Sequence, residues 1–127
     1  MLRGIYNKIT GQCGEDVAAE FLKKKKYKVL ERNYKNKIGE IDIIARDKEN
    51  LIFVEVKTRR SDKFGTPAEA VTYYKKQKIV NTAKVYLAEN PTDLNIRFDI
   101  VEVYGGFDGT QFNIEQINHF EHVFEEV

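Results

Sequence analysis

The chain has 127 residues, of which 42% are hydrophobic and 32% charged, a composition that excludes a disordered chain and a membrane-spanning one. The formal net charge is +1, but residues 1–90 carry +8 and residues 91–127 carry −7, an asymmetry that favours a nucleic-acid partner. Cys13 is the only cysteine, so it has no internal disulfide partner, and the N-terminus has no apolar run. We therefore expect a cytoplasmic protein without a signal peptide or a membrane partner.

The first half of the chain predicts one helix followed by three strands. Apolar residues recur on one face of residues 12–25, and a run of lysines ends this segment, as is typical of a helix C-terminus. Residues 27–35, 38–46 and 51–59 instead alternate or are rich in Ile, Val and Phe, which favours strands. The polar segment 47–50 predicts a tight turn between the last two strands.

The second half predicts another helix and at least one more strand. Thr66 and Pro67 suit the cap and the first turn of a helix over residues 67–89. Residues 95–104 alternate as a strand does, and a short final strand over 110–116 is left open. Turns are predicted at two places beyond residue 104, Gly105-Gly106 and Asp108-Gly109.

This order of elements, αβββαβ, predicts an α/β fold in which a mixed β-sheet is flanked by helices on both faces. We expect one domain over residues 1–127, with its core at about 11–104 and an acidic C-terminal extension over 105–127.

The predicted hairpin brings charged residues together. If the turn joins its strands symmetrically, Asp42 lies opposite Glu55 and Glu40 lies opposite Lys57, all on one face. These charges can be interpreted as surface salt bridges without a functional role. However, two opposed carboxylates repel each other unless a cation neutralises them. Their oxygens suit Mg²⁺ or Mn²⁺, so the hairpin predicts a metal site. The other face is wholly apolar, with Ile41, Ile43 and Ala45 against Val56, Val54 and Ile52.

Asp42 followed by Glu55-Val56-Lys57 resembles the pattern of the PD-(D/E)xK nuclease superfamily, with Ile41 in the place of the Pro. More closely, the chain resembles the YraN-type family of small uncharacterised bacterial proteins, also called UPF0102. The resemblance covers most of residues 11–103. The stretches that carry it are Gly11–Ala18, Gly39–Asp42, Val54–Arg59, Ala70-Val71 and Arg97–Val101.

The resemblance implies a restriction-endonuclease-like fold and Mg²⁺- or Mn²⁺-assisted hydrolysis of phosphodiester bonds, with DNA favoured over RNA. The core also resembles archaeal Holliday-junction resolvases, which carry a further glutamate on the first helix, a position that Glu15 matches better than Glu20. Because these relatives act as dimers, the resemblance also implies a homodimer. The implied roles are metal binding by Asp42, Glu55 and Glu15, catalysis by these three with Lys57, and support of Lys57 by Glu40.

Basic residues near the motif are candidate nucleic-acid contacts, although a solvated surface explains them equally well. Arg59, Arg60 and Lys63 follow the motif into a loop, and Lys75 and Lys78 lie on the following helix. Two alternatives to a nuclease therefore remain open, a non-catalytic nucleic-acid-binding module on the same fold and an assembly domain that has lost both roles.

Four further residues are interpreted as structural. Tyr73, Tyr74 and Tyr86 lie on the second predicted helix and favour core positions over base-stacking platforms. Asp99 lies on the fourth predicted strand, where we expect it to pair with Arg97 or another basic residue rather than to act in catalysis.

Overall fold

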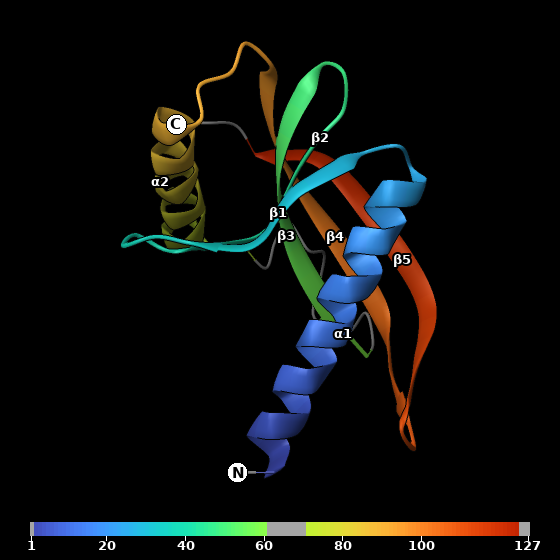
Figure 1. Ribbon diagram of the computed structural model, residues 1–127. Coiled ribbons are helices and arrows are strands. Elements are labelled where there is room, and N and C mark those ends of the chain that lie inside the picture. Colours follow the sequence, from blue (N-terminus) through green and yellow to red (C-terminus); the bar gives the residue numbers. More distant parts are fainter. Residues whose placement is uncertain (1, 61–70, 125–127) are drawn as a thin grey trace.

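The computed structural model describes residues 2–60 and 71–124, with side chains from residue 12 onward. It has an α/β fold in which one mixed sheet carries a helix on each face (Figure 1), as the sequence predicts. The elements in chain order are α1 (Leu2–Lys24), β1 (Lys28–Lys35), β2 (Glu40–Arg46), β3 (Asn50–Arg59), α2 (Tyr73–Glu89), β4 (Asn95–Asp108) and β5 (Gln111–Phe124).

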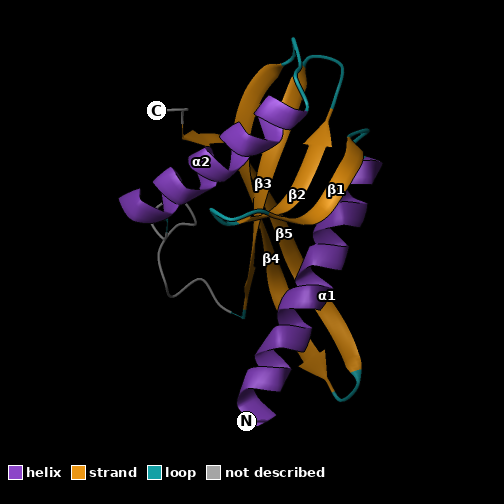
Figure 2. Cartoon of the chain, turned by 60° about the vertical axis from the view of Figure 1, so that its left-hand side comes forward, coloured by secondary structure: helices purple, strands orange, loops and turns teal. Residues whose placement is uncertain are grey.

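The strands lie side by side in chain order, β1-β2-β3-β4-β5. Only β3 and β4 are parallel among the described strands, and every other neighbouring pair is antiparallel. A parallel pair needs a crossover connection, and α2 lies in the chain between these two strands. Figure 2 shows α2 and α1 on opposite sides of the sheet. The crossover therefore returns the chain over the face opposite α1, and the first turn of α2 follows the end of β3.

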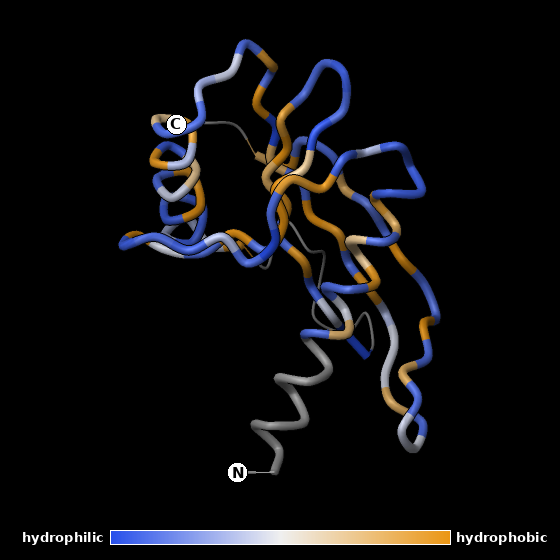
Figure 3. The backbone as a smooth tube through the Cα atoms, in the orientation of Figure 1, coloured by the Kyte–Doolittle hydropathy of each residue, from blue (hydrophilic) through white to orange (hydrophobic). Residues whose placement is uncertain are grey.

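Each helix packs on its own hydrophobic cluster. Ala18 and Leu22 of α1 pack with Ile43, Val54 and Val101 of the sheet. On the other face, α2 packs on a cluster that includes a stacked pair, Phe53 and Phe98, with ring centroids 5.5 Å apart. The apolar colouring in Figure 3 is accordingly concentrated in the central strands. Within residues 2–60 and 71–124, neither helix is long and apolar enough to cross a membrane.

Helix α1 begins at Leu2, well before the predicted start at residue 12. The apolar stripe marks only the part of the helix that packs on the sheet, and Figure 1 shows the first turns extending past it. The contact is closest at Gly14, where an added Cβ would overlap with Oγ1 of Thr58 on β3. This glycine allows α1 to approach β3 directly, which brings the next residue, Glu15, to the sheet.

Helix α2 begins later than predicted. Val71 and Thr72 precede it without helical structure, so the prediction of helix is wrong for these two residues. The Thr72 hydroxyl caps the helix by accepting a hydrogen bond of 3.2 Å from the Lys75 backbone N–H. The predicted cap and start, Thr66 and Pro67, lie outside the described residues.

The chain beyond residue 104 adds to the sheet. Gly105-Gly106 is not the predicted turn, because β4 continues to Asp108 through a register shift at Gly105. A Cβ at Gly105 would overlap with the carbonyl oxygen of Asn113, so this close pairing requires glycine. The predicted turn at Asp108-Gly109 is confirmed, with Gly109 at φ +66°. Strand β5 then runs to Phe124, far past the short strand over 110–116, because its extent follows backbone pairing with β4 rather than a regular apolar alternation.

Candidate functional site

The site begins where β2 and β3 separate. The symmetric register is confirmed from Ile43–Val54 to Arg46–Leu51, but the ladder ends there. The predicted extension of the ladder, with Asp42 opposite Glu55 and Glu40 opposite Lys57, is therefore wrong. Instead, Oδ2 of Asp42 accepts a hydrogen bond of 2.8 Å from the backbone N–H of Val56. A carboxylate thus joins the two strands at the point where backbone pairing stops.

The turn end of the β1–β2 hairpin runs toward α2 and away from β3 (Figure 1). The amide nitrogen of Asn36 donates a hydrogen bond of 3.2 Å to the Thr82 carbonyl oxygen on α2, which fixes the hairpin end to the helix. Ile41 consequently packs in the cluster under α2. The prediction that Ile41 shares an apolar face with Ile43 is therefore wrong.

Four carboxylates, which we call the carboxylate cluster, converge here: Glu15, Glu40, Asp42 and Glu55. Burial, together with repulsion from the other three carboxylates, raises the pKa of Asp42 to about 7, although the hydrogen bond from Val56 opposes this shift. Burial also raises the pKa of Glu15; the charge of Arg32 opposes this shift, and repulsion from Glu40 and Glu55 adds to it. Within the described part of the chain, the buried Oε1 of Glu15 accepts no hydrogen bond. Ionisation is therefore disfavoured at both Asp42 and Glu15.

Two lysines lie against this cluster. Oε1 of Glu55 is 3.6 Å from Nζ of Lys57 and 2.9 Å from Nζ of Lys75. Burial lowers the pKa of Lys57, and the contact with Lys75 lowers it further. At Lys75 burial opposes the shift, but the hydrogen bond with Lys57 and the charge of Glu55 raise the pKa. Both amines therefore contact the same oxygen of Glu55, and Lys75 holds its own proton more tightly than Lys57 does.

The sequence assigns Lys75 only to phosphate binding and misses its contact with Glu55. The order of elements could have indicated this contact. Glu55 and Lys57 lie near the end of β3, and α2 is the next element in the chain. Glu40, predicted as the partner of Lys57, instead forms an exposed ion pair of 3.8 Å with Lys35. This difference again follows from the hairpin end that bends away from β3.

A cleft of about 570 Å³ lies between the hairpin end and α2. Two of the predicted nucleic-acid contacts, Lys75 and Lys78, line one wall, and the loop over residues 36–39 lines the other. The cleft thus joins a basic wall to the acidic cluster. Its lining residues are 35–40, Asp42, Glu55, Lys75, Lys78 and Ile79.

The other predicted nucleic-acid contacts are placed differently. Arg59 is turned inward, with Nε 3.6 Å from the buried carboxylate of Glu102, which also accepts a hydrogen bond of 3.0 Å from Asn118. Arg60 is exposed and lies beside Gly106. Lys63 lies outside the described residues.

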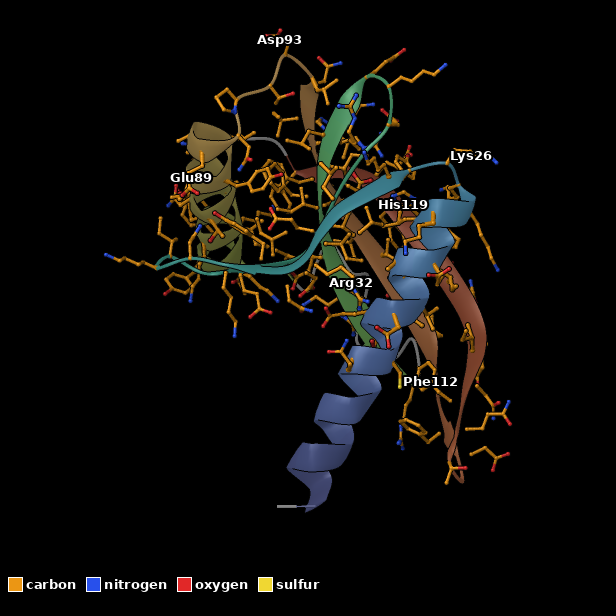
Figure 4. The ribbon with its side chains drawn as sticks, viewed as in Figure 1. Lys26, Arg32, Glu89, Asp93, Phe112 and His119 are labelled. Carbon is orange, nitrogen blue, oxygen red and sulfur yellow. The ribbon has the colours of Figure 1, made fainter. Side chains whose placement is uncertain are left out.

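A second charged cluster lies apart from the cleft, on the α1 side of the sheet. The buried carboxylate of Asp99 accepts two hydrogen bonds from Arg97, of 2.9 and 2.8 Å, and lies 2.7 Å from Nε2 of His119 (labelled in Figure 4). Burial opposes the shift, but these contacts hold the pKa of Asp99 below its usual range. The prediction that Asp99 pairs with Arg97 is confirmed.

This second cluster is nevertheless the tightest potential metal-binding group in the described part of the chain. Ligand atoms of Asp99, His119 and Glu121 lie within 4.8 Å of one another. Arg97 already neutralises Asp99, and Nζ of Lys25 lies 2.8 Å from Nδ1 of His119. Two cations therefore surround the group, and we interpret it as a charge network that fixes β5 to the sheet.

The tyrosines of α2 divide into two groups. Tyr86 is 5% exposed, as predicted for a core residue, but Tyr73 and Tyr74 are each 74% exposed. The core prediction is wrong for these two because they lie in the first turn of α2, before its first buried residue, Ile79.

Residues 14–103 match the profile of a family described as uncharacterised protein family UPF0102. The chain belongs to the UPF0102 family. The match includes the whole carboxylate cluster together with Lys57 and Lys75. The family resemblance that the motifs indicate is therefore confirmed.

Individual UPF0102 proteins align over nearly their whole length. One from Caldanaerobacter subterraneus subsp. tengcongensis is 48% identical over 124 residues, which is 97% of this chain and 100% of the relative. One from Clostridioides difficile is 50% identical over 101 residues, covering 77% of this chain and 87% of the relative. One from Alkaliphilus oremlandii is 44% identical over 124 residues, covering 93% and 99%. These UPF0102 proteins are thus close to this chain in length as well as in sequence.

Proposed function

We propose that this UPF0102 chain is a metal-dependent nuclease that hydrolyses phosphodiester bonds of nucleic acid, DNA in preference to RNA, in the cleft beside the carboxylate cluster. The observation that carries the proposal is the Asp42 carboxyl, whose pKa is raised to about 7 by burial and by neighbouring carboxylates. A partly buried group of like charges favours a bound cation, because a cation stabilises the ionised form of each member.

The residues present fit a hard divalent cation. Oε1 of Glu15 is buried and accepts no hydrogen bond in the described part of the chain, and Oδ2 is the oxygen of Asp42 that bonds to Val56. Carboxylate oxygens are the donors that Mg²⁺ and Mn²⁺ prefer. The oxygens of Glu15, Asp42 and Glu55 lie farther apart than the ligand atoms of Asp99, His119 and Glu121. We therefore expect a bound cation to draw these three carboxylates together.

A bound Mg²⁺ or Mn²⁺ would supply polarisation of a phosphoryl oxygen and activation of a water molecule. Lys57 lies beside Glu55, so it can orient the attacking water and, as an ammonium group, neutralise charge that develops on the phosphate. Lys75 and Lys78 line the same cleft and would bind neighbouring phosphates. Glu40 would hold Lys35 at the rim.

The test is cleavage of end-labelled DNA in single-stranded, duplex and branched forms, with Mg²⁺ or Mn²⁺. We expect the parent protein to cut at least one form and Asp42→Asn to lower the rate at least about 100-fold, because this substitution removes a metal ligand. Asn keeps an oxygen that accepts the Val56 hydrogen bond, so an unchanged circular dichroism spectrum serves as the folding control. The proposal fails if the parent protein cuts none of the three forms with either ion.

One observation favours a second candidate, a nucleic-acid-binding module without catalysis. The ammonium group of Lys75 lies 2.9 Å from Oε1 of Glu55 and so occupies an oxygen that a metal would need. Such a module would bind DNA with a strong dependence on salt concentration. Binding that survives Asp42→Asn, together with no cleavage by the parent protein, would support it.

A further inference from the structure

An exposed aromatic side chain lies on the cleft side of α2. Residues four apart share one face of a helix, so Tyr74 lies one turn before Lys78, which lines the cleft. Tyr73 is equally exposed but shares a face with Lys76, whose Nζ lies 5.7 Å from the centroid of the Phe124 ring. Tyr74 therefore lies just outside the cleft lining, on the helix face that leads to Lys78, and Tyr73 lies on the side of the helix that faces β5.

The opposite wall of the cleft presents an exposed aliphatic residue. Ile38 is 40% exposed although it lies in a tightly bonded loop. Oδ1 of Asn36 accepts hydrogen bonds from the backbone N–H groups of Ile38 (2.9 Å) and Gly39 (3.3 Å). The side-chain amide of Asn36 in turn bonds to the carbonyl oxygen of Thr82 on α2. These bonds fix the loop, so Ile38 projects outward from a rigid support.

The loop lies against the same stretch of α2 that follows Tyr74. A Cβ added at Gly39 would lie 3.2 Å from Cε of Lys78 and 2.8 Å from Oγ1 of Thr82. Ile38 is the residue before Gly39, and Tyr74 is one helical turn before Lys78. An exposed apolar side chain thus lines the cleft, and an exposed ring lies one helical turn from the wall that carries Lys78.

We propose that Tyr74 and Ile38 hold an unpaired base, so that the cleft binds a single-stranded segment of nucleic acid. This inference rests on the proposed function, because it names the substrate class of the same cleft. Aromatic rings interleaved with lysines are typical of sites that bind single strands, where each base offers a face for stacking. In a duplex, both faces of an internal base are covered by its neighbours.

The charge and the size of the cleft agree with a single strand. Lys75 and Lys78 on one wall and Lys37 on the other provide positive charge on both sides of the cleft, which suits the backbone of a single strand. A volume of about 570 Å³ falls within the range of pockets that enclose a small-molecule ligand. Such a cleft accommodates a nucleotide with its base, whereas a duplex presents a much broader surface.

The test is fluorescence anisotropy with a labelled single-stranded DNA oligonucleotide and with the blunt duplex of the same sequence, both in EDTA to prevent cleavage. We expect the parent protein to prefer the single strand, and Tyr74→Leu to weaken single-strand binding about 5- to 150-fold, the loss expected for one stacked base. Tyr74→Phe keeps the ring and should bind within about twofold of the parent. Tyr73→Leu is the matched control and should also bind like the parent, since its exposure equals that of Tyr74.

Three outcomes would overturn the inference: preference of the parent protein for the duplex, an unchanged affinity in Tyr74→Leu, or an equal loss in Tyr73→Leu. Each is separable from failure of the nuclease proposal, which is judged by cleavage. Ring-dependent binding without cleavage would remove the nuclease proposal alone. Cleavage that is unaffected by Tyr74→Leu, with unchanged binding, would remove the stacking inference alone.

Discussion

Asp42 and Val56 are joined by a hydrogen bond of 2.8 Å from the Val56 backbone N–H to the Asp42 carboxylate. This bond lies just beyond the last backbone pair of β2 and β3, Ile43–Val54. One oxygen of Asp42 therefore fixes the separated strands, while the carboxyl group as a whole lies among Glu15, Glu40 and Glu55. Asp42 therefore both joins β2 to β3 and belongs to the carboxylate cluster.

Asp42→Asn should stabilise the metal-free protein at high pH. The folded-state pKa of Asp42 is raised from 3.8 to about 7. Between these two pH values the folded protein keeps a proton on Asp42 that the unfolded chain releases. The stability due to that proton is fully present below about pH 4 and is lost as the pH rises through 7. At about pH 8 we expect the variant to exceed the parent by about 2–4 kcal/mol in free energy of unfolding, since one pKa unit corresponds to about 1.4 kcal/mol.

Urea unfolding in EDTA from about pH 4 to about pH 8 checks this expectation. The difference between variant and parent should become small at the acidic end, where the pH approaches the unfolded-state pKa of 3.8 and the folded protein keeps Asp42 protonated. A difference that stays constant over the whole range would show that Asp42 does not titrate as the cluster requires.

Lys75→Gln should raise the affinity for Mn²⁺. The ammonium group of Lys75 lies 2.9 Å from Oε1 of Glu55 and competes with a metal for that oxygen. Because the pair is partly exposed, we expect a gain of about 3- to 10-fold, measured by calorimetry. Lys76→Gln removes the same charge from the neighbouring position, near Phe124, and should leave the affinity within about twofold. Equal gains in both variants would indicate a general charge effect rather than competition at Glu55.

Gly14→Ala should destabilise the fold although alanine is the better helix former. The added Cβ would overlap with Oγ1 of Thr58, so α1 must move away from β3. We expect a net loss of about 1–3 kcal/mol in free energy of unfolding, because overpacking outweighs the gain in helix propensity of about 1 kcal/mol. Gly106→Ala is the control, since its Cβ would meet Arg60 Nε at 3.6 Å, an ordinary contact distance. Equal stability of the two variants in thermal unfolding would refute the close contact.

Asp99→Asn should cost stability without changing metal affinity. The substitution removes the negative partner of the half-buried Arg97 and of His119, so we expect a loss of about 3–5 kcal/mol in free energy of unfolding. Mn²⁺ affinity should stay within about twofold of the parent, because the second cluster lies apart from the cleft. A large loss of Mn²⁺ binding in this variant would instead assign the metal to Asp99, His119 and Glu121.

The sequence predicts those parts of the fold that depend on periodicity. The α/β class, the strands β1 to β4 and the β2–β3 register follow from alternation and from a short polar turn, which act locally. Only a short first part of strand β5 is anticipated, because the apolar residues beyond it do not alternate regularly. Gly105 is read as a turn because a close approach between two strands requires the same residue type as a turn does.

The candidate site is predicted in its residues rather than in its geometry. Asp42, Glu55 and Lys57 follow from the motif, and Glu15 follows from the family resemblance. The bend of the hairpin depends on a contact between Asn36 and Thr82, 46 positions apart, which no local pattern reveals. For the same reason the pairing of Glu40 with Lys35 and of Lys75 with Glu55 appears only in three dimensions.

Calorimetric titration with Mn²⁺ at about pH 8, above the pKa of Asp42, tests the central claim most directly. Saturable binding is predicted for the parent protein, with an affinity at least about 10–100-fold lower in Asp42→Asn and unchanged in Asp99→Asn. No heat of binding in the parent, or equal binding by Asp42→Asn, would contradict the assignment of the carboxylate cluster as a metal site.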